Sequence, residues 1–371
     1  MKSIWIALTL GSVATALAAD NARPALHWYR GNMHTHTRFV PESDANETPA
    51  YVAQWFKSHG YQFVVITDHE NLTDVRPLNA AHGKQGEFLV IQGQEVTQMV
   101  ADPNHPGGVR HAHMNGINTQ RLIMPIPPPV SPKGTEIAAY AAKTSMREAY
   151  ERNLAEIRKA GGIPQINHPN LLWSVRLEDL LSLRSAYLME VWNAFSTSNN
   201  LGGTDDAGHV SPSTEELWDD LLSAGKVVWA TANDDSHTYH SFDDPGAPNP
   251  GRAWVVVHAP ELSAAAITTA LAHGEFYSST GIRIADYQVR AGTISIQLEP
   301  LPEWSSSLAP STRYVTRFIG CKGRVLATVT GLSPHYQIRG DEGYVRASII
   351  DSDGRRAWTQ PVFTDGRKVP E

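Results

Sequence analysis

Short apolar runs rich in β-branched and aromatic residues alternate with helical patterns over roughly two hundred residues of this chain. The runs predict strands at residues 28–36, 61–67, 88–96, 163–167, 186–193 and 226–232. Cap residues followed by helical spacing predict helices after Thr48 and Ser145, and two more at residues 214–224 and 262–272. This alternation is typical of βα units, so we expect an α/β fold with a largely parallel sheet.

The C-terminal hundred residues have a different pattern. Beyond residue 272, alternating strands are punctuated by glycine, which predicts a β-rich region. We place the boundary near residue 280, with a catalytic domain at 20–280 and a β-rich domain at 281–371. Prolines interrupt residues 118–144, which we interpret as a long loop, and residues 303–311 as another.

The N-terminus has the three parts of a secretory signal. Lys2 precedes an apolar run at residues 4–14, and small residues follow at 16–19. We expect residues 1–19 to be removed and the protein to be secreted or periplasmic. The alternative is a retained membrane anchor, although the run is shorter than the ~20 residues that span a bilayer. We expect no later transmembrane segment. Cys321 is the only cysteine, so no intrachain disulfide can form.

The charge pattern bears on partners. The net charge is -7, and no basic block or Lys/Arg-rich helix is present. A protein that follows a phosphate backbone needs such a basic surface. We therefore do not expect a nucleic acid polymer as partner. The sequence does not indicate an oligomeric state.

Histidines and acids stand where predicted strands end. His34 and His36 close the first strand at i and i+2, a spacing that puts both imidazoles on one side. Further candidates follow the other strands or lie in a loop, as His113 does: Asp68, His69, Glu95, His113, His168, Asp235 and His237. Sites in α/β proteins form beyond the carboxyl ends of parallel strands. A mixture of imidazoles and carboxylates suits zinc, manganese or iron, and more than four ligands indicates more than one ion.

These motifs together resemble the polymerase and histidinol phosphatase (PHP) family. The resemblance rests on HTHT at 34–37, TDHE at 67–70, Glu95, HMN at 113–115, NHP at 167–169 and DSH at 235–237. It covers about residues 27–280 and implies a distorted seven-stranded (β/α) barrel with two or three divalent metal ions. The signal, EVWN at 190–193 and the β-rich tail are similar to the secreted branch that includes carbaryl hydrolases.

The resemblance also implies roles for single residues. One ion would be bound by His34, His36, Glu95 and Asp235. Glu95 would bridge to a second ion, which His113 and His168 complete. A third ion would be bound by Asp68, His69 and His237, or these residues would lie around the first two ions. Many relatives have one more histidine before the bridging glutamate, where this chain offers only His82.

Four further residues are candidates for catalysis or substrate binding. Glu190 and Asn193 could orient ligands or substrate, or could be polar residues at a strand end whose hydrogen bonds have only a structural role. Arg110 could bind an anionic substrate, or could be a solvated loop residue without a role in binding. His240, close to Asp235 and His237, could donate a proton to the leaving group.

We therefore expect a metal-dependent hydrolase that uses a metal-bound hydroxide on a small, anionic phosphoester. The alternatives are a carbamate or carboxylic ester hydrolase with the same centre, an exported metal-containing binding protein without turnover, and an amidohydrolase. The chain has no Gly-x-Ser-x-Gly elbow, Walker motif or dinucleotide fingerprint.

Overall fold

A computed structural model describes residues 25–41, 43–127, 141–184, 187–205, 208–300 and 313–368. The expected signal at 1–19, residues 128–140 of the loop at 118–144 and the loop at 303–311 lie outside these residues, so they stay predictions. No helix within the described part of the chain is long and apolar enough to cross a membrane.

The strands that lie around the candidate site come first in the chain. They are β1 (His27–Asn32), β2 (Phe63–Ile66), β3 (Leu89–Ala101), β4 (Val109–Ile117), β5 (Ile163–Ile166), β6 (Tyr187–Asn193) and β9 (Val228–Asn233). They follow one another across the sheet in this order. The sheet is mixed, which corrects the expectation of a largely parallel one, because β4 pairs antiparallel with both β3 and β5.

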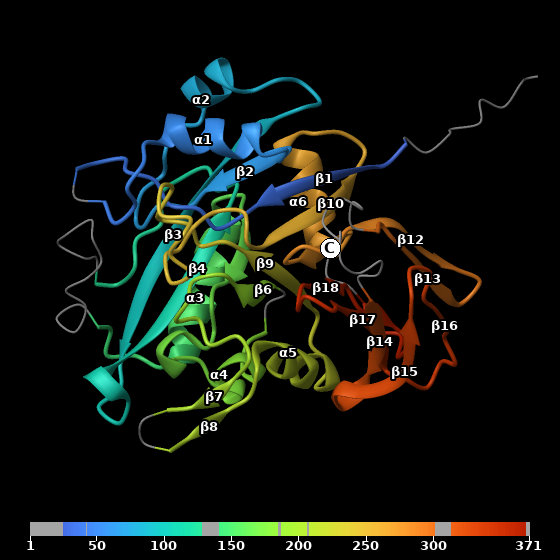
Figure 1. The fold of residues 1–371 in the computed structure, drawn as a ribbon. Coiled ribbons are helices and arrows are strands. Elements are labelled where there is room, and N and C mark those ends of the chain that lie inside the picture. The colour runs from blue at the N-terminus through green and yellow to red at the C-terminus, as the bar shows by residue number, and fades with distance from the viewer. Residues whose placement is uncertain are drawn as a thin grey trace, which may run out of the picture.

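The expected closed barrel of seven strands is not established. The other neighbour of β1 is β10 (Trp254–Ala259), which pairs with it antiparallel. Strands β1 and β9 are connected beyond their ends by one isolated parallel bridge, between Thr35 and Ser236. The hydrogen-bonded sheet therefore continues from β1 into the C-terminal part of the chain (Figure 1).

Helices pack against this sheet. They are α1 (Pro49–Ser58), α2 (Arg76–Ala81), α3 (Met146–Lys159), α4 (Leu177–Leu181), α5 (Thr214–Ser223) and α6 (Ala264–Ala272). The predicted starts of α1 and α3 are confirmed, since Thr48 caps α1 and Ser145 forms a capping box with Glu148. The apolar face of α3 is buried in the core through Tyr150 and Leu154.

The C-terminal strands follow β10, and most of them extend the same large sheet. They are β11 (Phe276–Ser279), β12 (Ile284–Arg290), β13 (Thr293–Leu298), β14 (Tyr314–Gly320), β15 (Arg324–Thr330), β16 (His335–Gln337), β17 (Tyr344–Asp351), β18 (Arg356–Thr359) and β19 (Val362–Phe363). Strand β18 pairs with β11, whereas β12, β13 and β16 form a separate small sheet. This β-rich region lies beside the strands that surround the candidate site (Figure 1).

Candidate metal centre

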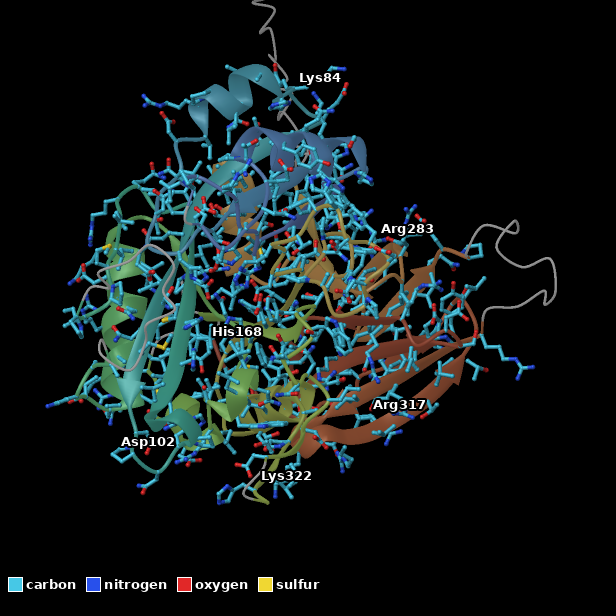
Figure 2. All side chains as sticks on the ribbon, turned by 60° about the vertical axis from the view of Figure 1, so that its left-hand side comes forward. Lys84, Asp102, His168, Arg283, Arg317 and Lys322 are labelled. Atoms are coloured by element: carbon cyan, nitrogen blue, oxygen red, sulfur yellow. The ribbon has the colours of Figure 1, made fainter. Side chains whose placement is uncertain are left out.

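The predicted histidines and acids converge beyond the ends of β1, β2, β5 and β9 and on the middle of β3 and β4. Figure 2 labels His168, which lies toward the middle of the molecule. Two placements differ from expectation. Glu95 lies inside the long strand β3, not at its end, and His113 lies within β4, not in a loop.

The first group of donor atoms surrounds one point. His34 Nε2 lies 3.2 Å from Glu95 Oε2 and 3.2 Å from Asp235 Oδ1. His36 Nε2 lies 3.2 Å and 3.1 Å from the same two oxygens. Four ligands placed about 2.0–2.1 Å from a tetrahedral ion would be separated by about 3.3–3.4 Å. The spacing therefore matches one ion held between these four atoms.

Glu95 also faces a second group. Its other oxygen, Oε1, lies 3.2 Å from His113 Nδ1 and 3.4 Å from His168 Nε2. The three side chains are all buried. One carboxylate thus offers an oxygen to each of two neighbouring donor groups, which is the arrangement of a bridging ligand.

A third group includes a residue that the sequence did not reveal. His36, Asp44, His69 and His237 present donor atoms close to one another. Asp44 Oδ2 lies 3.1 Å from His69 Nε2 and 3.4 Å from His237 Nε2. Asp44, rather than His82, thus completes this group. His82 lies at the end of α2, where its Nδ1 is 3.1 Å from the side-chain oxygen of Gln54.

Asp68 does not belong to any of these donor groups. Its carboxylate accepts hydrogen bonds from the backbone N–H of Thr37, at 2.6 Å, and from the hydroxyls of Thr37 and Thr73. These bonds hold the segment that follows β1. Asp68 is therefore placed to support the chain that bears His34 and His36, not to contact an ion.

Two other candidates are engaged away from the donor groups. The guanidinium of Arg110 is buried, donates to Ser174 O at 2.6 Å and forms an ion pair with Asp179. It is therefore not free to bind an anionic substrate. His240 Nε2 lies 2.6 Å from Glu47 Oε1 at the surface, so the expected proton donor instead pairs with a carboxylate.

Glu190 and Asn193 support the ligands from behind. Glu190 is fully buried and its Oε1 lies 2.9 Å from His34 Nδ1, while its Oε2 accepts from the backbone N–H of His168 at 2.8 Å. Asn193 donates to Glu190 Oε2 at 2.8 Å and to Asp235 Oδ2 at 3.1 Å. Because the Glu190 carboxylate accepts a hydrogen bond, His34 Nδ1 bears the proton, which leaves His34 Nε2 free to bind a metal. Both residues thus orient ligands, and neither is exposed to a substrate.

Backbone strain accompanies two of the ligands. His168 has φ 24° and Asp235 has φ 52°, and residues other than glycine rarely adopt such values. Such strain persists only where the surrounding structure enforces it, and it gathers at functional sites. Here the bond from His168 N–H to Glu190 and the bond from Asp235 N–H to His34 O, at 3.0 Å, fix these turns.

The electrostatics favour a cation. Burial disfavours the charged form of His34, yet charge interactions with Asp235, Glu190 and Glu95 raise the pKa of His34 well above its ordinary value. Burial likewise opposes ionisation of Glu95, but His34 and His69 hold its pKa well below the ordinary value. Carboxylates that stabilise a proton on neighbouring imidazoles also stabilise a divalent ion placed between them.

His36 gives a further test of whether metal ions fit. Its Nε2 is buried and makes no hydrogen bond within the described residues, although two carboxylate oxygens lie 3.1–3.2 Å away. A buried nitrogen that makes no hydrogen bond is costly. The histidine and carboxylate donor set, with this nitrogen facing two carboxylate oxygens, fits zinc, manganese or iron.

Comparisons with known proteins give likenesses of structure alone. No protein-family model and no curated protein matches the chain. A structure described as a two-domain protein containing a predicted PHP-like metal-dependent phosphoesterase, from Bacteroides vulgatus, is 14% identical. The match covers 91% of this chain and 96% of that one, with a TM-score of 0.44. A lesion-specific endonuclease from Pyrococcus furiosus is 13% identical over 66% of this chain and 55% of that one, with a TM-score of 0.34. Scores of this size do not define a shared fold.

We expect the purified protein to contain at least two transition-metal ions per chain. The bridging position of Glu95 and the three donor groups exceed the capacity of one ion. Elemental analysis after mild purification measures the stoichiometry. Less than one ion per chain, with no recovery on adding manganese, zinc or iron, would contradict the site.

Glu190→Gln should weaken metal binding about 10- to 100-fold, the usual effect of losing a residue that orients a metal-binding histidine. An amide can present its NH2 group to His34 and so allow the wrong tautomer. A competition titration with a chromophoric chelator measures the Kd. Glu87→Gln, an exposed acid paired with Lys84, is the matched control and should leave the Kd unchanged. Equal affinities for both variants would show that Glu190 does not orient His34.

Proposed function

We propose that this protein is a metal-dependent hydrolase of the PHP type that cleaves phosphoric esters. The observation that supports this most strongly is Glu95, whose two oxygens face two separate donor groups. The sequence motifs at residues 34–37, 67–70, 113–115, 167–169 and 235–237 supply the same residues in the family order.

Divalent ions bound here would lower the pKa of a coordinated water toward neutrality and would neutralise charge that develops on the attacked ester. The chain's own residues set the geometry for that chemistry. Glu95 keeps the first two donor groups adjacent, and Asp235 closes the first group. Glu190 and Asn193 hold His34 and Asp235 in position and exclude water from behind them. With this centre, hydrolysis needs no serine or cysteine nucleophile.

We also propose that β1, β2, β3, β4, β5, β6 and β9 correspond to the seven strands of a PHP barrel. The bridge from Thr35 to Ser236 supports this, since it brings the ends of the first and last of these strands together. An experimental structure with metal bound would test it: β1 and β9 should be direct neighbours, and their separation by another element would contradict the proposal.

A second candidate function is hydrolysis of an uncharged carbamate or carboxylic ester. It is favoured by Arg110, whose ion pair with Asp179 removes the cation expected to bind an anionic substrate. The same metal centre would serve this reaction, because one oxyanion also gains from the ions.

The two functions differ in substrate preference. For the phosphoesterase we expect kcat/KM for an aryl phosphodiester or monoester to exceed that for an aryl carbamate or acetate with the same leaving group at least tenfold. This ratio corresponds to about 1.4 kcal/mol of transition-state stabilisation, a modest demand on several ions. Steady-state rates with metal-replete enzyme give the ratio, and chelated enzyme gives the background. A higher kcat/KM for the carbamate or carboxylic ester would contradict the phosphoesterase function but would remain consistent with the metal centre.

A further inference from the structure

A cavity separate from the donor groups lies between the far end of the β3–β4 hairpin and α5. It has a volume of about 610 Å³. Its walls come from the 3-10 turns η1 (Pro106–Gly108) and η3 (Leu171–Trp173), the short strand β8 (Val210–Ser211) and α5. Figure 2 labels Asp102, next to the η1 wall, at the edge of the molecule and His168 nearer the middle. No residue of the metal donor groups lines this cavity.

Trp173 provides a flat apolar wall in a fixed position. It and Leu172 adopt φ values of 57° and 50°, two consecutive left-handed residues other than glycine. Strain of this kind is kept where the surroundings enforce it. On one side the indole packs against the backbone of β7 (Gly203–Thr204), where a Cβ at Gly203 would lie 3.1 Å from Trp173 Cη2. The glycine therefore leaves room for the ring, and the ring is held against the strand.

His105 lines the same cavity and has a buried hydrogen-bond acceptor. The side chain is 7% exposed, and its Nδ1 lies 3.0 Å from Pro106 O. A carbonyl oxygen can only accept, so Nδ1 bears the proton of the neutral ring and Nε2 has the lone pair. Nε2 is buried and has no partner within the described residues. A buried acceptor without a partner is costly, and a ligand hydroxyl would satisfy it.

The charges around the cavity argue against an anionic ligand. Three carboxylates, Asp205, Glu178 and Asp220, line it together with one guanidinium, that of Arg176. Asp205 already pairs with His209, whose Nδ1 lies 2.9 Å from Oδ2. An ammonium ligand would therefore not find this carboxylate free to neutralise it. Acceptor groups beside an apolar ring suit a neutral ligand that donates several hydrogen bonds.

From this cavity we infer a second binding site, for a neutral hydroxyl-bearing ring such as a sugar. The ring stacks on Trp173, and one hydroxyl donates to His105 Nε2. The site is independent of the hydrolase function proposed above, because it shares no residue with the donor groups.

Isothermal titration calorimetry of the full mature protein with neutral mono- and disaccharides tests the site. Glucose, galactose, mannose, N-acetylglucosamine, maltose and cellobiose are suitable probes. We expect at least one to bind at one site per chain, and we expect binding to persist after chelation. Trp173→Ala and His105→Phe should each weaken it at least tenfold. Val210→Arg changes an exposed residue of the wall, leaves the core intact and should also weaken binding.

Phe242→Ala, an exposed ring outside the cavity, is the control and should bind as the wild type does. Circular dichroism and metal content check that each variant is folded. The absence of binding for every saccharide up to 10 mM (about 2.7 kcal/mol in binding free energy) would overturn the inference. So would unchanged affinity in folded Trp173→Ala or Val210→Arg protein, or preferential binding of benzylamine or inorganic phosphate.

Discussion

Glu95→Gln is expected to reduce kcat/KM at least about a thousandfold, or about 4 kcal/mol in transition-state stabilisation. Each oxygen of Glu95 faces a different donor group, with His34 and His36 on Oε2 and His113 and His168 on Oε1. Glutamine replaces one of these oxygens by an NH2 group, which has no lone pair to offer. The substitution therefore removes both the bridge and the negative charge between two cations. Steady-state kinetics and elemental analysis of the same sample measure the two effects.

His237→Ala is the comparison for this prediction. His237 belongs to the third donor group, with Asp44 and His69, and its loss leaves a position that water can fill. We expect a loss of about tenfold or less for this variant, with at least two ions retained. Glu87→Gln controls for the removal of one carboxylate. Mild and equal losses in Glu95→Gln and His237→Ala would show that Glu95 does not bridge.

The sequence located those parts of the centre that depend on strand ends. Apolar runs mark where strands stop, so His34, His168 and Asp235 could be assigned to one edge from periodicity. Their mutual distances confirm that they converge. Asp44 could not be found in this way, because it lies in an irregular segment before α1 without any apolar period. Only the fold brings it to His69.

Strand β4 was missed for a physical reason. Its sequence, VRHAHMNGI, alternates little and contains two histidines, an arginine and an asparagine, which lowers its apparent strand propensity. These polar residues are nevertheless mostly buried, because they have partners on neighbouring segments: Asn115 accepts from Asn167, and Arg110 pairs with Asp179. A strand that is polar because it builds a site does not show the apolar pattern of an ordinary strand. The misplacement of His113 in a loop and of Arg110 at the substrate both follow from this.

The C-terminal region shows the same limit for long-range pairing. Alternation and glycine turns predicted its strands, but not that β18 would pair with β11 or that β17 would pack on α5. Tyr277 on β11 pairs with Thr359, 82 positions away, and the buried Arg346 on β17 contacts Asp219 on α5, 127 positions away. Substituting Arg346 is the second change for which we expect a large effect, this time on the free energy of unfolding.

Arg346→Met is expected to lower the free energy of unfolding by about 3–5 kcal/mol, the usual cost of removing one partner from a buried ion pair. Arg346 is fully buried on β17, and its guanidinium donates to both oxygens of Asp219, at 2.7 Å and 2.6 Å, and to Glu215 at 2.9 Å. It also lies 4.6 Å from the centre of the Trp218 ring. Burial opposes its charge, yet the two carboxylates raise the pKa of Arg346 above its ordinary value. Methionine fills similar space but leaves the buried carboxylate of Asp219 without its cation. Urea denaturation followed by circular dichroism measures the change.

Three further variants show whether this loss comes from the ion pair. Arg317→Met removes an exposed arginine from the adjacent strand β14 and should change stability by no more than about 0.5 kcal/mol. Arg346→Lys keeps the charge but cannot form two parallel bonds to one carboxylate, so we expect an intermediate loss. Adding Asp219→Asn to Arg346→Met removes the uncompensated charge and should recover part of the stability, because the penalty lies in the unpaired carboxylate rather than in lost packing. A loss for Arg346→Met no larger than that for Arg317→Met would show that the arginine does not hold the C-terminal strands to α5.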